Sequence, residues 1–322
     1  MIKTKERLDL QDEHENPEQT VDYYYDLYMD DVKLRCKLTT VKMKQSILET
    51  KVLPFFGSMR VCDITPKLIR KWQVGLSDPE LGFSSSYLHY INAQFSAFME
   101  YVKELCDLPA NPFERVRSMG SLKTRCSRYW TPKEYFAFRD AARAEPLAYI
   151  CFETLFWTGI RVGELLALTP EDIELDRKEI SINKTFQKIS GKKYVWEPKT
   201  KSSVRTIMIP EFLADELKEY MDGIETYDDW RRVFPVDVDW LHYRIHKYAK
   251  IAQVRDINVH GLRHSAASLL INRGFGALEV SHRLGHSRPS ITLNTYSHMF
   301  PSRQEDIVNF LDRVESGESG ND

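Results

Sequence analysis

A break between two helical regions constrains the fold of this 322-residue chain more than any other feature. A proline-containing stretch at 109–112 ends the first region, and a Ser-, Lys- and Arg-rich segment with few apolar residues follows. A chain of this length is expected to form about two domains, each large enough to bury its own core. The sequence therefore predicts one domain at 18–113 and another at 129–300, joined by a basic linker at 114–128.

The two ends of the chain are predicted to lie outside these domains. Residues 1–17 are polar and acidic and end at Pro17, which is typical of a flexible lead-in. Residues 301–322 contain an apolar pattern between Gln304 and Val314 that predicts a C-terminal helix, followed by a polar tail.

Helix signals dominate both predicted domains. In the first, Thr65 before Pro66 and Ser84 before a long apolar pattern are typical N-caps, and we expect four or five helices. In the second, Thr131 caps a helix in the same way. Residues 179–182, 194–196 and 205–209 instead alternate with the period of strands, and helical spacing returns from Ala214 onward. The predicted fold is mainly α, with a small antiparallel β-sheet in the second domain.

Composition narrows the class of protein. Hydrophobic residues make up 42% of the chain and charged residues 29%, as in ordinary soluble globular proteins. No stretch approaches the roughly 20 apolar residues that a membrane span needs. The 5 cysteines form no Cys-x-x-Cys pair, which argues against a disulfide framework or a thiolate zinc site. We expect a cytoplasmic protein.

Charge is distributed unevenly along the chain. The net charge of −2 argues against a polyanionic partner. Between 184 and 205, however, a single acid, Glu197, stands among basic residues, which are Lys184, Lys188, Lys192, Lys193, Lys199, Lys201 and Arg205. A solvated hairpin would explain this run equally well, so charge alone permits DNA binding without establishing it.

Arg161 lies in the sequence Thr-Gly-Ile-Arg-Val-Gly-Glu-Leu, at the predicted start of a helix. A cation there opposes the helix dipole unless an anion lies nearby. A bound phosphate would supply that anion. Glu164, three residues on, would supply it equally well as a structural ion pair.

Histidines cluster late in the chain. His260 and Arg263 are three residues apart, so on a helix their side chains share a face, and His286 follows a glycine. Zinc binding is an alternative, because three histidine pairs have i, i+4 spacing: His242/His246, His260/His264 and His282/His286. None of the pairs contains the glutamate of a His-Glu-x-x-His site, so we predict no metal site.

Tyr296 is one of 16 tyrosines, and alone it would be read as a buried aromatic. Its position after Arg161, Lys199, His260, Arg263 and His286 gives it a different meaning. Cations and hydrogen-bond donors of this kind are suited to holding a phosphate diester. We therefore expect Tyr296 to be a nucleophile.

Taken in order, these motifs resemble the conserved boxes of the tyrosine recombinases, the integrases of phages and conjugative transposons. The resemblance extends from about residue 18 to about residue 315. It implies a two-domain clamp on duplex DNA, with a helical, SAM-like core-binding domain ahead of the catalytic domain. It also implies that a mobile element uses this chain for integration and excision.

The resemblance assigns a role to each catalytic residue. Tyr296 would attack a DNA phosphodiester and form a 3'-phosphotyrosyl link, with no metal, ATP or other cofactor. Arg161 and Arg263 would bind the phosphate, and His260 and His286 would assist. Lys199 resembles the hairpin lysine that acts as general acid. Lys201 is two residues away and remains an alternative.

The resemblance also implies partners. We expect DNA core or attachment sites, a homotetramer on paired sites, and an excisionase or a host DNA-bending factor, with no membrane partner. Expected DNA contacts beyond the catalytic set are Lys42, Lys44, Tyr87, Arg125, Lys201, Arg205 and His264. A DNA-binding relative that does not cut, or a metal-dependent nuclease, are the alternative functions.

Two features at the chain ends bear on assembly. Many such integrases carry an N-terminal domain for arm-type DNA sites, and residues 1–17 are too few to form one. The chain is thus expected to be truncated or to act on core sites alone. The predicted helix at 304–314 resembles one that family members dock on a neighbouring protomer, and packing on its own protomer is the alternative.

Overall fold

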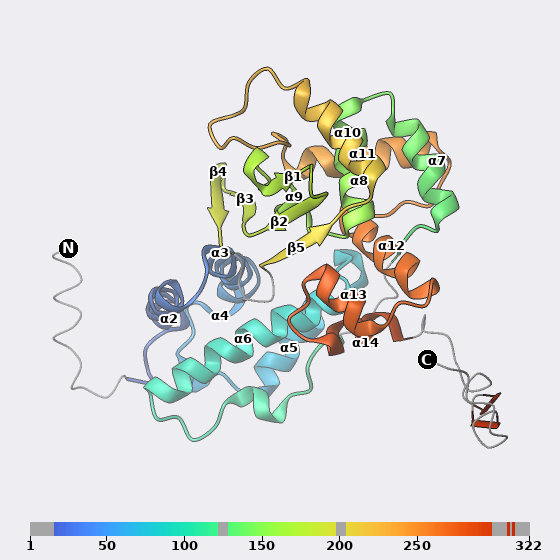
Figure 1. The fold of residues 1–322 in the computed structure, drawn as a ribbon. Helices are drawn as coiled ribbons and strands as arrows, with labels where there is room; N and C mark the ends of the chain where they lie inside the picture. The colour runs from blue at the N-terminus through green and yellow to red at the C-terminus, as the bar shows by residue number, and fades with distance from the viewer. Residues whose placement is uncertain (1–15, 122–127, 198–203, 298–307, 310, 313–322) are drawn as a thin grey trace. The chain divides into compact units, whose positions relative to one another are not determined.

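The chain folds into two compact units, Met1–Thr124 and Arg125–Asp322, which run from blue to cyan and from green to red in Figure 1. Each unit buries its own hydrophobic core. The structure, a computed structural model, describes residues 16–121, 128–197, 204–297, 308–309 and 311–312.

The described part of the first unit is helical. Thr65 caps α5 by accepting a hydrogen bond from the Leu68 N–H, and Ser84 caps α6 by accepting one from the Tyr87 N–H, which confirms both predicted caps. The elements are α2 (Val21–Arg35), α3 (Leu38–Ile47), the π-helical η1 (Leu48–Val52), α4 (Leu53–Phe56), η2 (Val61–Asp63), α5 (Pro66–Leu76), η3 (Pro79–Leu81), α6 (Ser85–Leu105) and η4 (Pro112–Arg115).

An aromatic cluster forms the centre of this unit. Phe56, Trp72 and Phe95 come from three different helices, and their ring centroids lie 4.8–5.8 Å apart. The Trp72 indole donates a hydrogen bond to the Lys51 carbonyl at 2.7 Å. Each ring of this size buries a large apolar area, so the cluster ties the three helices together.

The first unit extends beyond its predicted end at residue 113. Met119 is only 5% exposed and belongs to this unit's core, and Gly120 has a φ of 69°. A Cβ on Gly120 would lie 2.0 Å from the Ser85 carbonyl oxygen, so the backbone itself packs on α6. The first residues of the predicted linker are therefore part of the domain, because Val116 and Met119 anchor a segment that is otherwise mostly polar.

The second unit is also mainly helical. Thr131 caps α7 together with Glu134 in a capping box, as its sequence predicts. The helical elements are α7 (Pro132–Ala142), α8 (Pro146–Thr158), α9 (Val162–Leu165), η5 (Pro170–Asp172), α10 (Glu211–Asp222), α11 (Val238–Ile251), α12 (Val259–Asn272), α13 (Ala277–Leu284) and α14 (Pro289–Tyr296).

Two small antiparallel sheets accompany these helices, which confirms the predicted fold class. One has the strand order β1-β2-β5, with Ile180 paired with Ile207, and the other is a hairpin of β3 and β4. The strands are β1 (Ile173–Glu174), β2 (Glu179–Ile182), β3 (Thr185–Ile189), β4 (Lys192–Trp196) and β5 (Arg205–Met208). The sequence does not predict β3, because Gln187 and Lys188 interrupt its apolar alternation.

Helix α8 lies at the core of the second unit. It is buried over most of its length and packs against α10 and α12 (Figure 1). Gly159 ends the helix in the left-handed conformation, with a φ of 68°. A Cβ there would lie 2.7 Å from Leu284 Cδ2, so glycine allows α13 to approach this end of α8. Among the helices that the structure describes, none has the length and apolar character needed to cross a membrane.

Candidate active site

Tyr296 is the last residue of α14 and is only 3% exposed. Its ring packs in a small apolar cluster with residues of α12 and α13, among them Ala267 and Leu284. Its hydroxyl lies 2.5 Å from Nδ1 of His264. Burial, opposed in part by the charge of Arg263, raises the pKa of Tyr296 to about 12. The phenol is therefore protonated at neutral pH.

Helix α12 carries three of the predicted site residues. Asn258 caps it by accepting a hydrogen bond from the Gly261 N–H at 2.9 Å. His260 and Arg263 follow in the first two turns, and His264 lies one turn beyond His260. The rings of His260 and His264 meet edge to face, with centroids 4.9 Å apart. One helix thus presents two of the predicted phosphate ligands and the partner of Tyr296.

Arg263 is a buried cation that is incompletely paired. It is 3% exposed, and its Nη1 donates to the Gly159 carbonyl at 2.8 Å. Its Nη2 is buried and has no hydrogen-bond partner among the described residues. Burial, with the nearby charge of Arg161, lowers the pKa of Arg263 to about 9. A buried donor without a partner is costly, so this position favours an incoming anion.

Arg161 lies just before α9 and is fixed at both ends of its guanidinium. Its Nη1 donates to Glu164 at 2.8 Å, and its Nη2 donates to the Gly285 carbonyl at 3.1 Å. The structural ion pair that the sequence allows is therefore present. It does not block the residue, because the Arg161 side chain is still 39% exposed. A partly exposed guanidinium held in this way can receive a further anion.

Glu164 is a buried carboxylate that accepts hydrogen bonds from both Arg161 and Arg205. It is 5% exposed, and its bond from Arg205 Nη2 measures 2.9 Å. Burial opposes its ionisation, but the hydrogen bonds and charges of Arg205 and Arg161 hold the pKa of Glu164 below its usual value. Arg161, Arg205, Arg263 and Glu164, which we call the arginine cluster, therefore have a positive net charge that suits a phosphate diester.

His286 follows Gly285, which ends α13 with a φ of 69°. Its Nδ1 lies 2.8 Å from Oγ1 of Thr292, a residue of α14 that is fully buried. Burial and the charges of Arg263, Arg161 and Arg205 lower the pKa of His286 to about 3. Burial, Arg263 and Arg161 also lower the pKa of His260. Both imidazoles are therefore neutral at pH 7, and each carries a single N–H. In His286 this N–H lies on Nε2, ready for a ligand, when Nδ1 accepts from the Thr292 hydroxyl.

Arg205 does not fit its predicted role as a DNA contact. Its side chain is 8% exposed and bonds to Glu164, and its Nε donates to the Arg283 carbonyl at 3.0 Å. A Cβ on Gly285 would lie 2.6 Å from an Arg205 nitrogen. The basic run suggests a solvated cation, but β5 directs this side chain inward because the buried carboxylate of Glu164 needs a second cation. His264, another predicted DNA contact, hydrogen-bonds to Tyr296.

The remaining predicted residues are divided between the units. Lys199, Lys201 and Arg125 lie outside the described residues, as does most of the predicted helix at 304–314. In the first unit, Lys42 is exposed, Lys44 donates to Tyr28 and Gln94, and Tyr87 packs on Phe83.

Helix α5 has an exposed basic face that is not among the predicted DNA contacts. Lys67, Arg70 and Lys71 are exposed there at i, i+3 and i+4 spacing. Their spacing along the predicted helix could have identified them.

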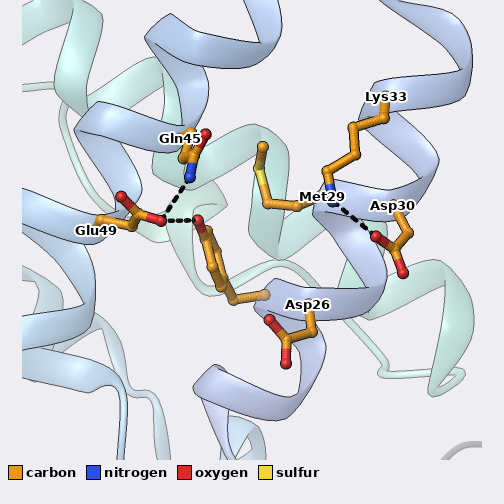
Figure 2. A pocket seen from close by; sticks show the side chains of 7 residues that line it. Asp26, Met29, Asp30, Lys33, Gln45 and Glu49 are labelled. Carbon is orange, nitrogen blue, oxygen red and sulfur yellow. Dashed lines mark hydrogen bonds and ion pairs between the residues drawn. The ribbon is translucent and has the colours of Figure 1, made fainter.

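The first unit also contains a pocket of about 350 Å³ between α2, α3 and η1, shown in Figure 2. Its side chains are paired with one another: Glu49 accepts from Tyr25 at 2.7 Å, and Lys33 bonds to Asp30 at 2.9 Å. The lining residues are Tyr25, Asp26, Met29, Asp30, Lys33, Gln45 and Glu49. Three carboxylates and one cation line this pocket, which makes it unsuitable for phosphate.

Two of the histidines considered for zinc are hydrogen-bonded to other side chains. His246 hydrogen-bonds to Asp256, and His264 to Tyr296. Within the described ranges, no three or more His, Cys, Asp or Glu side chains are grouped so as to hold a metal ion.

Comparison with known families gives two matches. Residues 130–303 match the phage integrase family, and residues 20–77 match the phage integrase N-terminal SAM-like domain. Among curated proteins, the chain is similar to the ICEBs1 integrase of Bacillus subtilis strain 168. The two are 25% identical over 97% of this chain and 88% of the relative.

Solved structures share the fold. The Tn1549 transposon integrase in complex with a circular intermediate DNA has a TM-score of 0.74 at 18% identity, over 92% of this chain and 99% of that one. A lambda integrase tetramer bound to a Holliday junction has a TM-score of 0.65 at 18% identity, over 90% and 86%. At these low identities, the similarity establishes the fold and nothing more.

Proposed function

The chain belongs to the phage integrase family of tyrosine recombinases, and on that premise we propose that it cuts and rejoins DNA at the attachment sites of a mobile element. One observation supports this most directly. Tyr296, the predicted nucleophile, contacts α12. The same helix carries His260 and the buried, incompletely paired guanidinium of Arg263.

The proposed reaction exchanges one phosphate ester for another. The Tyr296 oxygen attacks the phosphorus, the bond from phosphorus to the 5'-oxygen breaks, and a 3'-phosphotyrosyl link forms. The phenol loses its proton, and the leaving 5'-oxygen gains one. In the second step, a 5'-hydroxyl attacks this link and releases Tyr296. Since ester bonds are conserved, the exchange does not need ATP.

The arginine cluster would provide the charge that the transition state needs. The Nη2 of Arg263 and the exposed part of Arg161 are the donors available to the non-bridging oxygens. Fixed guanidinium groups in a site with little water stabilise developing negative charge strongly. Neutral His260 and His286 would each donate one further hydrogen bond. These cations would take the place of a metal ion at the phosphate.

Lys199 is proposed as the general acid that protonates the leaving oxygen, with Lys201 as the alternative. The test is to compare Lys199→Ala with Lys201→Ala on a substrate in which sulfur replaces the bridging 5'-oxygen. A thiolate leaves without protonation, so the variant that lacks the general acid should recover on this substrate. Recovery of Lys201→Ala alone would overturn the assignment of Lys199.

The printed descriptions of the relatives support a proposal about partners. Because the Tn1549 and lambda integrases were solved on DNA, and lambda integrase as a tetramer, we propose that this chain acts as a tetramer on paired core sites. An excisionase or a host DNA-bending factor would set the direction of the reaction. The exposed basic residues of the first unit, Lys42 together with Lys67, Arg70 and Lys71, are proposed phosphate contacts.

The deciding experiment traps the covalent intermediate. The protein is incubated with a nicked duplex that carries the attachment core of its own element, because the fragment beyond the nick diffuses away and stops religation. We expect a protein–DNA adduct that survives denaturant, forms in EDTA and disappears in Tyr296→Phe while DNA binding persists. An adduct that persists in Tyr296→Phe would contradict the role of Tyr296. Cleavage that requires a metal would indicate a nuclease instead.

A further inference from the structure

Among the described residues, His264 is hydrogen-bonded to Tyr296, the proposed nucleophile. Oη of Tyr296 lies 2.5 Å from Nδ1 of His264, and the two ring centroids are 5.6 Å apart at an angle of 58°. This geometry directs the phenol oxygen to one particular ring nitrogen. His264 is not among the residues to which the family resemblance assigns a catalytic role.

His264 is itself held in place by its surroundings. Its ring is half-buried on α12 and meets the ring of His260 edge to face, one helical turn away. The same stretch of α12 carries Arg263, whose guanidinium is fixed on the carbonyl of Gly159. The position of the phenol oxygen is therefore set by the helix that positions two proposed phosphate ligands.

Protonation states determine which group donates. Burial, with the neighbouring His260 and Arg263, lowers the pKa of His264 to about 4. The imidazole is therefore neutral at pH 7, and the phenol, whose pKa is raised to about 12, keeps its proton. When the histidine carries its proton on Nε2, Nδ1 has a free lone pair and the phenol donates to it. In that arrangement the lone pairs of Oη remain available for attack.

We propose that His264 is a positioning residue for Tyr296: its Nδ1 accepts the phenol hydrogen bond and holds the oxygen beside the phosphate ligands on α12. This rests on the proposed function. His264 does not serve as the final proton acceptor, because an imidazole with a pKa near 4 does not keep a proton taken from a phenol with a pKa near 12. Its effect on the reaction is through the orientation of Tyr296.

Two substitutions test which nitrogen matters. The amide oxygen of His264→Asn can occupy the position of Nδ1, whereas that of His264→Gln reaches the position of Nε2. Adduct formation on the nicked duplex is measured for both variants, relative to the DNA that each binds. We expect His264→Asn to stay near the wild-type rate and His264→Gln to be slower by roughly 10²-fold, the cost of a small misplacement of a reacting group. Equal rates for both variants, whether normal or reduced, would overturn the proposal.

A measurement without DNA separates this inference from the proposed function. In protein labelled with ¹⁵N-histidine, the signals of His264 are assigned by their loss in His264→Asn. We expect an Nδ1 that carries no proton, and a shift of this signal in Tyr296→Phe, where its donor is removed. A protonated Nδ1 would contradict the proposal even if the adduct forms. If the spectrum is as expected but no adduct forms on DNA, the contact between Tyr296 and His264 stands and the recombinase function is refuted.

Discussion

Glu153 and Glu164 are both buried carboxylates of the second unit, at 1% and 5% exposure, but they are held by opposite kinds of partner. Glu153 in α8 accepts from the Tyr135 hydroxyl at 2.6 Å and from the Trp157 indole at 2.9 Å. Both donors are neutral. Glu164 instead accepts from the guanidinium groups of Arg161 and Arg205.

The two carboxylates therefore titrate in opposite directions. Burial raises the pKa of Glu153, and its two neutral donors offset this only in part. Burial acts on Glu164 in the same sense, but the cations around it reverse the outcome. Burial thus does not decide whether a buried acid is charged; its partners do. Glu153 is a polar group in the apolar interior around α8. Glu164 instead stays ionised and fixes two arginines of the arginine cluster.

The largest expected effect comes from removing the carboxylate of the arginine cluster. Glu164→Gln removes the carboxylate that pairs with the buried Arg205, and breaking such a pair costs about 3–5 kcal/mol of unfolding free energy. Urea unfolding, followed by a probe in the second unit, measures this loss. The matched control is Glu211→Gln, which removes an exposed partner of Lys178 and should leave the urea midpoint unchanged. Equal midpoints for the two variants would show that the cluster does not depend on Glu164.

Arg263 should matter for chemistry more than for stability. Arg263→Met takes the donor from the Gly159 carbonyl but also removes a buried cation with an unpaired nitrogen. These effects oppose each other, so we expect a change of less than about 1 kcal/mol in unfolding free energy. Adduct formation should fall by roughly 10²–10³-fold, as for other transition-state donors.

Arg232 provides the matched comparison for Arg263. It is equally buried, but it is paired with Asp228 at 2.8 Å. Arg232→Met should lower the urea midpoint and leave adduct formation per folded molecule intact. If Arg232→Met instead lost adduct formation and Arg263→Met lost stability, the proposed difference between the two arginines would be wrong.

Tyr135→Phe tests the other carboxylate. It removes the 2.6 Å hydrogen bond to Glu153, and a buried acceptor that loses a donor costs about 1–3 kcal/mol. The urea midpoint should fall accordingly, with no change in adduct formation. If adduct formation fell by more than the fraction of folded protein, the hydrogen bond between Tyr135 and Glu153 would also affect the candidate active site.

The smallest expected effect is a difference in pH dependence. Glu164, with a lowered folded pKa, contributes stability that is present above its ordinary value of 4.5 and is lost as the pH falls through the folded value. Glu153, with a raised folded pKa, contributes stability that is present below 4.5 and is lost as the pH rises through its folded value.

The variant that isolates Glu153 is Glu153→Gln. As the pH rises above the ordinary value of 4.5, this variant should gain stability relative to wild type, by at most about 1.4 kcal/mol per pH unit. Urea midpoints at increasing pH measure the gain. A difference from wild type that does not vary with pH would show that Glu153 titrates normally.

Local patterns predict much of this fold. The caps at Thr65 and Thr131 are predicted because a side-chain oxygen next to a proline leaves few alternatives, and the pair of Arg161 with Glu164 because i, i+3 spacing brings the two together. Burial of charge is not predicted. Arg205 stands in a basic run like its neighbours, and only the packed structure places Glu164 beside it. Contacts between distant segments, such as that of His264 with Tyr296, have no local signal.

The burial of Arg205 against Glu164 has a consequence for ionic strength. Mobile ions screen charges that are in contact with solvent, with a Debye length of about 8 Å at physiological salt, and act much less on a pair at 8% and 7% exposure. Contacts between exposed lysines and DNA phosphates weaken steeply as salt rises. Concentrated salt should therefore release DNA while the orientation of Arg161 persists, so that the protein returns to its substrate on dilution with the site already assembled.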